Sequence, residues 1–134
     1  MLSGNSIESV MTPYPYSIEM DAHVSSAKAM LTQFKIRHLP VKEGDKLAGV
    51  ITMRDITRAE DCGIDTSTSS DVRVRQLCNT NVYVVRPAEP LVNVLKYMAE
   101  NYIDSALVAR SGKLEGIFTF TDAFKRYADL LSGK

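Results

Sequence analysis

The sequence predicts a mixed α/β (α+β) fold in which one β-α-β-β-α unit occurs twice in tandem. A shift of 67 positions superposes residues 10–58 on residues 77–125 without a gap, so the chain carries an internal repeat. In each copy, short runs of strand-forming residues alternate with segments whose apolar residues recur at helical spacing. Turn-forming residues also interrupt the later apolar runs at equivalent places. We therefore expect two copies of the same small fold.

The two copies share residue character more often than residue identity. Tyr16 aligns with Tyr83, and Gly49 aligns with Gly116. The other identical pairs are Ile36/Ile103, Val41/Val108, Lys46/Lys113, Leu47/Leu114, Thr52/Thr119 and Asp55/Asp122. Sparse identity on a preserved apolar pattern is what a shared fold requires.

Each copy is predicted to begin with a short strand followed by a helix. The strands are expected at residues 16–20 and 82–86, which are rich in aromatic and β-branched residues. Apolar residues then recur every three or four positions, which is typical of a helix with one buried face. They are Val24, Ala27, Met30, Leu31 and Phe34 in the first copy, and Leu91, Val94, Leu95, Met98 and Tyr102 in the second.

A β-hairpin and a second helix are predicted to complete each copy. Turn residues at 43–45 and 111–112 separate apolar runs that we expect to pair as strands. These runs cover residues 39–41 and 47–52 in the first copy, and 106–109 and 114–119 in the second. The closing helices are expected at 54–60 and 121–131, the latter with an apolar stripe of Phe124, Tyr127 and Leu131.

The repeat divides the chain into residues 1–60, a connector at 61–71, and residues 72–134. The connector contains five consecutive Ser and Thr residues, Thr66 to Ser70, and is expected to be solvated and to bind nothing.

Composition and charge exclude several classes of protein. The chain of 134 residues has 16 Lys plus Arg and 16 Asp plus Glu, so no surplus of cations favours nucleic acid. Cys62 and Cys78 form no Cys-x-x-Cys pair, which favours a reducing compartment. Polar residues interrupt the first 20 positions, so neither a signal peptide nor a membrane span is predicted there. We expect a cytoplasmic protein without membrane contact.

Several motifs resemble those of the cystathionine-β-synthase (CBS) domain family, in the paired form called a Bateman module. The leading segment Val10–Pro13, the strand Ile36–Val41 and the element Gly49–Asp55 carry this resemblance. Gly116–Asp122 repeats the last element as Gly-Ile-Phe-Thr-Phe-Thr-Asp. The resemblance implies that the repeats pack by pseudo-two-fold symmetry, sheet against sheet, and leave two clefts as nucleotide sites. It further implies a regulatory module without catalysis, a homodimer that covers the helical faces, and an effector protein whose identity is unknown.

The repeated Thr-x-x-Asp element has the chemistry to bind a nucleoside. In each copy a Thr ends a strand, and an Asp follows three positions later at a helix start. The carboxylates of Asp55 and Asp122 could accept hydrogen bonds from ribose hydroxyls, while Thr52 and Thr119 lie beside a phosphate-binding helix N-terminus. The same spacing is close to an ordinary capping box, which needs no ligand. Both interpretations stay open, and the two roles are compatible.

The copies differ at the start of the central strand. Arg37 and His38 in the first copy align with Asp104 and Ser105 in the second. Together with Arg54, the first pair offers cationic donors to a phosphate, so we predict tighter phosphate binding in the Asp55 cleft. A solvated charge for Arg37 and a strand-end residue satisfied by the backbone for His38 are equally open interpretations.

The resemblance places the adenine base against apolar residues of each copy. In the first copy these surround Ile18, Ile36 and Leu39, and in the second they are Val85, Ile103 and Ala106. The predicted ligand-binding residues are Ile18, Arg37, His38, Thr52, Arg54 and Asp55 in the first copy, with Ile103, Ser105, Thr119 and Asp122 in the second. Pro40, typical of the family, is replaced by Leu107 in the second copy, which alters that cleft's wall.

The sequence leaves the ligand and one rival function open. AMP, ADP, ATP, S-adenosylmethionine and dinucleotides share the ribose and base contacts described above, as regulatory ligands rather than cofactors. The rival is a protein-interaction module with no small-molecule ligand. His23, His38, Cys62 and Cys78 fit no catalytic triad and no metal-ligand spacing, so neither an enzyme nor a metal site is predicted.

Overall fold

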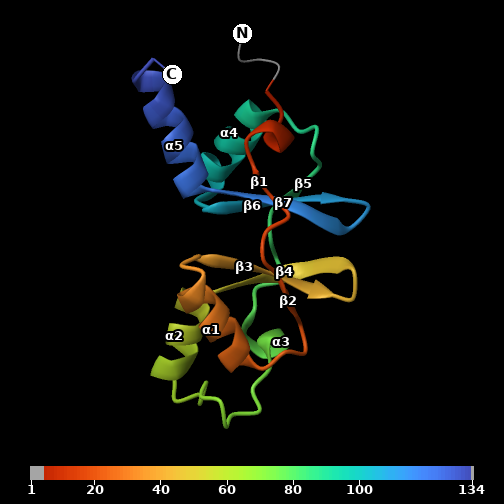
Figure 1. The fold of residues 1–134 in the computed structure, drawn as a ribbon, viewed down its shortest axis with the longest axis vertical. Helices are drawn as coiled ribbons and strands as arrows, with labels where there is room; N and C mark the ends of the chain where they lie inside the picture. Colours follow the sequence, from red (N-terminus) through yellow and green to blue (C-terminus); the bar gives the residue numbers. More distant parts are fainter. Residues whose placement is uncertain (1–4, 134) are drawn as a thin grey trace. The chain divides into compact units, whose positions relative to one another are not determined.

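The structure, a computed structural model, describes residues 5–133 and divides them into two compact units (Figure 1). The unit that we call the first-repeat unit is Tyr16–Val82. The second-repeat unit joins the N-terminal segment, up to Pro15, to the residues from Tyr83 onward. The division of the sequence into residues 1–60, 61–71 and 72–134 follows the repeat and remains our proposal for its boundaries. The compact units cut the chain at other points.

The first-repeat unit is a three-stranded sheet with helices. Strand β2 (Ile18–Glu19) pairs in parallel with β3 (His38–Glu43), which forms an antiparallel hairpin with β4 (Lys46–Thr52). The helices are α1 (Val24–Gln33), α2 (Met53–Asp61) and the short α3 (Val74–Leu77).

The second-repeat unit repeats this plan with one additional strand. Its sheet has the order β1-β7-β6-β5, where β1 (Thr12–Pro13) comes from the N-terminal segment and β5 is Val84–Val85. The hairpin is β6 (Ser105–Arg110) and β7 (Lys113–Thr119). The helices are α4 (Leu91–Asn101) and α5 (Phe120–Leu131), and a 3-10 turn, η2 (Ile7–Ser9), precedes β1.

The predicted mixed α+β fold is confirmed, and the order β-α-β-β-α is present in both units. The opening strands are shorter than predicted, because only two residues of each run pair with the neighbouring strand. The sequence pattern also missed β1 and α3. Both are too short to show a periodicity, since a two-residue strand and a four-residue helix complete no repeat of apolar positions.

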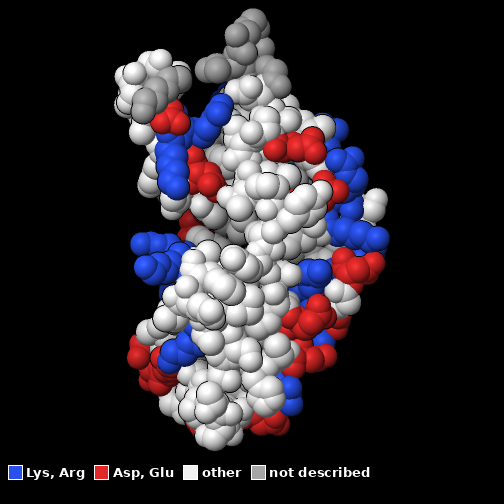
Figure 2. Space-filling view, in the orientation of Figure 1, with Lys and Arg blue, Asp and Glu red and all other residues white. Residues whose placement is uncertain are grey.

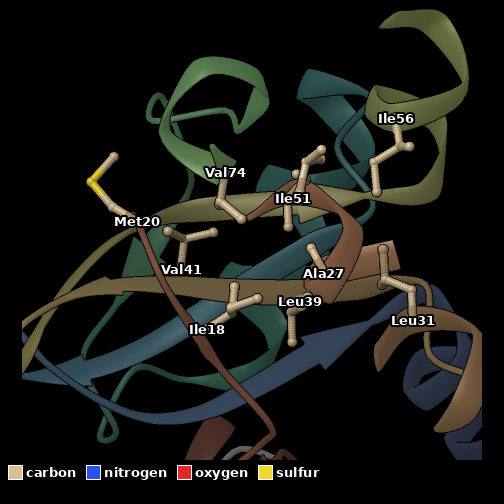
Figure 3. Close-up of a cluster of buried hydrophobic side chains, with 10 residues drawn as sticks. Ile18, Met20, Ala27, Leu31, Leu39, Val41, Ile51, Ile56 and Val74 are labelled. Atoms are coloured by element: carbon tan, nitrogen blue, oxygen red, sulfur yellow. The ribbon is translucent and has the colours of Figure 1, made fainter. Parts of the chain in front are cut away.

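The core of the first-repeat unit lies between its sheet and its helices (Figure 3). Leu39 and Val41 of β3 and Ile51 of β4 are fully buried and point to the same side of the sheet, as alternate residues of a strand do. Figure 3 shows these side chains grouped with residues from β2 and all three helices: Ile18, Ala27, Leu31, Ile56 and Val74. This packing holds the end of β4 against the start of α2.

The core of the second-repeat unit includes a residue from the far N-terminal end of the chain. Phe118 of β7 and Val94 of α4 are fully buried, and so is Ile7 of η2. The backbone around Ile7 is bonded to the loop before α4: the Ile7 N–H donates to the Glu89 carbonyl at 2.8 Å, and the Leu91 N–H donates to the Asn5 carbonyl at 3.0 Å. The leading segment of the first repeat therefore folds with the second.

The converse holds for the segment that leads into the second repeat. Asn79 and Val50 exchange both backbone hydrogen bonds, at 2.8 and 2.9 Å, so residues around Asn79 extend the edge of β4. The equivalent contact in the other unit is the pairing of Thr12 with Ile117 on β7, because the repeat aligns Thr12 with Asn79 and Ile117 with Val50. Each repeat thus carries, along its hairpin, the leading segment of the other repeat.

The connector is anchored rather than solvated throughout, which corrects the expectation from its composition. Thr66 and Ser70 are buried, with 5% and 8% of their surface exposed. The Thr66 hydroxyl donates to the Glu60 carboxylate, which also accepts from Lys28 Nζ at 2.6 Å. His23 Nδ1 lies 3.1 Å from the Ser70 carbonyl oxygen. Hydroxyl-rich composition indicates polarity but does not reveal that Thr66 and Ser70 are buried.

Candidate functional site

Both Thr-x-x-Asp elements lie at the junction between the last strand of a hairpin and the helix that follows. Thr52 ends β4 and is the N-cap of α2, and Thr119 ends β7 and is the N-cap of α5. Both have extended backbones, with φ of −123° and ψ of 163° and 174°. The strand thus continues through the Thr, and the helix begins at the next residue, which places the Asp in the first helical turn.

In the first-repeat unit, three hydrogen bonds join Thr52 to Asp55. Asp55 Oδ2 accepts from the Thr52 backbone N–H at 2.9 Å and from the Thr52 hydroxyl at 3.0 Å. The Asp55 N–H donates to Thr52 Oγ1 at 3.2 Å. This is a complete capping box, so the capping interpretation of the motif is correct for α2.

Two of these three hydrogen bonds recur in the second-repeat unit. Asp122 Oδ2 accepts from the Thr119 N–H at 2.9 Å and from the Thr119 hydroxyl at 3.3 Å. Both Asp side chains are half-buried. The hydrogen bonds described for the two pairs use Oδ2 of each carboxylate and leave Oδ1 as a further acceptor. A capped Asp can therefore still accept a hydrogen bond from a ligand hydroxyl.

The hairpin register brings a second predicted site residue beside each Thr. His38 is directly opposite Thr52, and Ser105 is directly opposite Thr119. Residues opposite each other in an antiparallel pair have Cβ atoms about 4.5–5.5 Å apart and point to the same face. His38 and Ser105 are half-buried. The structure thus brings together a Thr, an Asp and one further polar residue in each unit.

The two predicted arginines flank this group in the first-repeat unit. Arg37 immediately precedes β3 and Arg54 is the second residue of α2, and both are exposed. In the second-repeat unit, the position of Arg37 is taken by Asp104, whose carbonyl accepts a hydrogen bond from the Phe120 N–H at 3.2 Å. The charge difference expected between the copies is therefore located at the strand-helix junctions.

The two predicted apolar contacts lie deeper than the polar residues. Ile18 is only 8% exposed and is part of the first-repeat core. Ile103 is half-buried and packs against the second-repeat core. Contact of either side chain with an adenine base stays a prediction.

Sequence reasoning missed the segment that lies next to the Asp55 group. Cys78 is half-buried against the first-repeat core, and Asn79 is bonded to Val50. Burial raises the pKa of the Cys78 thiol, and the negative charge of Asp55 raises that pKa further. Cys78 therefore lies within electrostatic range of Asp55, the residue predicted to bind the ribose, although the two residues belong to different repeats in the sequence.

A glycine in the second strand of each hairpin indicates that another segment of the chain passes close to that strand. A Cβ placed on Gly49 would lie 2.5 Å from the Asn79 carbonyl oxygen. A Cβ on Gly116 would lie 2.2 Å from Met11 Sδ. Glycine in a strand interior often marks a place where another part of the chain comes close. The repeated Gly could thus have predicted a crossing segment, though not which segment it is.

Within residues 5–133, no group of three or more His, Cys, Asp and Glu residues is placed to hold a metal ion. None of the helices in the same range is long and apolar enough to cross a bilayer.

Comparison with known proteins agrees with this geometry. The chain is 27% identical over 120 residues to an uncharacterised protein of Methanocaldococcus jannaschii, a match that covers 89% of this chain and 37% of that protein. A crystal structure of a putative acetoin utilization protein (AcuB) from Vibrio cholerae has a TM-score of 0.84 at 26% identity, covering 96% of this chain and 93% of that one. This chain spans little more than a third of the curated relative's length.

Two further solved structures share the fold and contain ligands. CBSX2 in complex with AMP has a TM-score of 0.81 at 22% identity, covering 95% of this chain and 98% of that one. The CBS domain pair of protein MJ0100, in complex with 5′-methylthioadenosine and S-adenosyl-L-methionine, has a TM-score of 0.79 at 22% identity, covering 92% and 96%.

A family model matches both copies of the repeat and shows the family. The model of the CBS domain matches this chain twice, at residues 7–61 and 74–129, which together span most of its length. Both matches contain the strand-helix junction with its Thr and Asp, and the first begins at Ile7. The chain belongs to the CBS domain family and consists of a pair of CBS domains.

Proposed function

We propose that this CBS pair is a regulatory module that binds an adenine nucleotide or another adenosyl ligand and catalyses no reaction. One observation carries the proposal: in both units, a capping box fixes an Asp carboxylate at a strand-helix junction and leaves its second oxygen as an acceptor. A fixed carboxylate loses little conformational entropy when it binds a ribose hydroxyl. The ligands expected are AMP, ADP, ATP or S-adenosylmethionine.

The ligands of the related structures support this proposal. CBSX2 was crystallised with AMP, and the MJ0100 pair with 5′-methylthioadenosine and S-adenosylmethionine. All three ligands contain adenine and ribose but differ in what is attached to the 5′ carbon. A site that recognises ribose through Asp55 or Asp122 is compatible with each of them, and the flanking residues decide the preference.

The two units are proposed to prefer different 5′ groups. Arg37, His38 and Arg54 surround the first junction with cationic or hydrogen-bond-donating groups that suit a phosphate. The second junction has Ser105 and the acidic Asp104 instead. We infer that a phosphorylated nucleotide binds more tightly at the Asp55 junction than at the Asp122 junction.

The remaining parts of the proposal concern partners and location. We infer a cytoplasmic homodimer that acts on an effector protein and binds neither nucleic acid nor membrane. Acidic and basic side chains are interspersed on the face drawn in Figure 2, and the formal net charge of the chain is zero. A neutral chain has no excess charge with which to attract a polyanion.

A thermal-shift titration with AMP, ADP, ATP, S-adenosylmethionine, NAD and GTP tests the proposal. Binding should stabilise the protein by about 2.7 kcal/mol when the free ligand is at 100 times its dissociation constant. Asp55→Ala and Asp122→Ala should each abolish the response of one site. Because both variants also lose a helix cap, each shift is measured against the variant's own ligand-free melting temperature.

Matched variants separate ribose binding from capping. Asp55→Asn keeps an acceptor for the Thr52 N–H but removes the negative charge, so it should keep most of the stability and lose much of the affinity. Asp61→Asn, an exposed acid at the end of α2, should leave both unchanged. A ligand response that persists undiminished in the double variant Asp55→Ala/Asp122→Ala would overturn the assignment of these residues.

The rival function is a protein-interaction module with no small-molecule ligand. The complete capping box at Thr52 favours it, because the motif then has a structural role that needs no nucleotide. It predicts a protein that unfolds cooperatively and whose melting temperature none of the six ligands raises.

A further inference from the structure

The two leading segments dock through the same set of backbone hydrogen bonds. They are residues 5–13, which fold with the second-repeat unit, and residues 72–80, which fold with the first-repeat unit. The backbone bonds do not distinguish one segment from the other, because three of them recur after a shift of 67 positions. The recurring N–H and carbonyl pairs are Ile7 to Glu89 and Val74 to Ala22, Glu8 to Pro87 and Arg75 to Met20, and Leu91 to Asn5 and Val24 to Val72.

The apolar contacts of the two segments are also alike. The repeat aligns Ile7 with Val74, and both side chains are fully buried, each in the core of the unit with which it folds. Val10 and Leu77 are a second aligned pair, and both pack, half-buried, against those cores. Hydrophobic burial has no direction, and cores tolerate swaps between side chains of similar volume. Apolar contacts therefore favour docking but choose weakly between the segments.

The charged contacts of the two segments are opposite in sign. In the first-repeat unit, Arg75 Nη2 lies 2.6 Å from Oε2 of Glu43, the last residue of β3. In the second-repeat unit, Glu8 Oε2 lies 3.7 Å from Nη2 of Arg110, the last residue of β6. The repeat aligns Glu8 with Arg75, and it aligns Glu43 with Arg110. Each hairpin thus carries the charge opposite to that of the segment that docks on it.

A further charge at each docking site differs between the units. Arg75 Nε also donates to Asp21 Oδ1 at 3.1 Å, whereas the position aligned with Asp21 is Ala88. An acidic residue in place of Arg75 would therefore face two carboxylates. In the second-repeat unit, Arg110 Nε donates to Glu115 Oε2 at 3.1 Å. Because Glu115 offsets part of the charge of Arg110, the first-repeat site discriminates more strongly.

Docking of each segment on its own repeat would bring like charges together. Glu8 would then meet Glu43 and Asp21, and Arg75 would meet Arg110. An exposed ion pair favours docking by about two- to three-fold in an equilibrium constant, and a like-charge contact opposes it by a similar factor. Two attractive contacts in one arrangement and two repulsive contacts in the other therefore separate the arrangements by roughly 30-fold.

We propose that the reversed ion pairs Glu8–Arg110 and Arg75–Glu43 select which leading segment docks on which repeat, so that the chain folds with these segments exchanged. A duplicated fold needs such a choice, because its two docking sites otherwise offer similar contacts to both segments. The choice also determines what lies beside each candidate site. Residues 72–80 place Cys78 near Asp55, and residues 5–13 place the Met11 side chain against Gly116 of β7. This proposal does not depend on which ligand the sites bind.

Methyl NMR spectroscopy of the full chain shows which core holds Ile7. In the wild type, the Ile7 methyl groups should show nuclear Overhauser effects (NOEs) to Val94 and other second-repeat core residues. Glu8→Arg/Arg75→Glu exchanges the two charges and keeps the net charge, so the roughly 30-fold preference should reverse. At about 0.01 M salt, where screening is weak, this variant should give Ile7 NOEs to Val41 and other first-repeat core residues. Ile7 contacts confined to the second-repeat core, or lost from both cores, would overturn the proposal.

Matched variants separate this selection from a general effect of charge. Lys96→Glu/Glu100→Lys exchanges two exposed charges of α4 outside both docking sites, so Ile7 should stay in the second-repeat core. Glu8→Arg alone brings like charges together at Arg110 and needs no rearranged state to be informative. It should raise the unfolding constant in urea about 5-fold at about 0.01 M salt and less than about 2-fold at about 1 M, because the Debye length falls from about 30 to about 3 Å. An equal loss at both salt concentrations would contradict a role for charge.

Discussion

Replacing Ile7 with Ala should destabilise the second-repeat unit, although Ile7 lies in the segment that leads into the first repeat. The Ile7 side chain is fully buried among Val85, Val94 and Met98. Truncating a buried Ile to Ala costs roughly 2–5 kcal/mol, depending on how far the cavity collapses. Ile7 lies in a three-residue 3-10 turn near the chain end, which can shift toward the cavity, so we expect about 2–3 kcal/mol.

Native-state hydrogen exchange measured by mass spectrometry should locate this loss. A decrease of 2–3 kcal/mol corresponds to a fall in protection of about 30- to 150-fold. The fall should appear in peptides from residues 83–133 and not in peptides from residues 16–82. Ile56→Ala is the matched control, because Ile56 is also fully buried but belongs to the first-repeat core, so it should give the opposite pattern. Loss of protection in residues 16–82 on Ile7→Ala would refute the assignment of Ile7 to the second-repeat unit.

Three other substitutions test separate parts of the structure. Gly49→Ala should destabilise the chain by about 1–3 kcal/mol in urea denaturation, because the added Cβ would lie 2.5 Å from the Asn79 carbonyl oxygen; an unchanged midpoint would mean that this segment is not held there. Tyr102→Gly should stabilise it by about 0.5–1 kcal/mol, because Tyr102 ends α4 with φ of 56° and is 93% exposed; a lower melting temperature would contradict this. Asp55→Asn should speed alkylation of Cys78 at pH 8, because removing the nearby negative charge lowers the thiol pKa and increases the thiolate fraction; an unchanged rate would show that the two residues do not interact.

The hairpins and their helices could be predicted because their signals are local. The turns at Gly44 and Gly112 have positive φ, 66° and 79°, as tight hairpin turns require. Each hairpin strand has a run of three consecutive buried residues, and Val24, Ala27 and Leu31 recur at helical spacing, so both kinds of element are marked by local apolar patterns. Each of these patterns lies within a dozen residues, so a single sequence contains all the information needed.

The exchange of leading segments could not be predicted in the same way. Ile7 contacts residues more than 75 positions away, and no local pattern names its partner. The resemblance of Val10–Pro13 to a family motif places that segment at the start of the first repeat, which is correct for the sequence. In space, Thr12 and Pro13 pair with β7 of the second repeat. The strand glycines signalled a close neighbour, but a missing side chain does not specify what fills the space.

The part of the candidate site that could be predicted is the part whose residues lie within one helical turn of each other. Thr and Asp three positions apart at a strand-helix junction meet whatever the rest of the fold does. The position of His38 opposite Thr52 needed the hairpin register, which the turn alone does not supply, because a β-bulge between Val41 and Lys42 shifts the pairing by one residue. The proximity of Cys78 to Asp55 depends on the exchanged segment, so no local pattern of residues indicates it.

Capping and ligand binding support each other at this site rather than compete. The Thr52 N–H and hydroxyl hold Oδ2 of Asp55, which fixes the plane of the carboxylate and thus the direction in which Oδ1 can accept a hydrogen bond. A carboxylate already ordered by the fold loses less entropy on binding than a free one. For this reason, Asp55→Asn together with the ligand titration separates the two roles more cleanly than Asp55→Ala, which removes both.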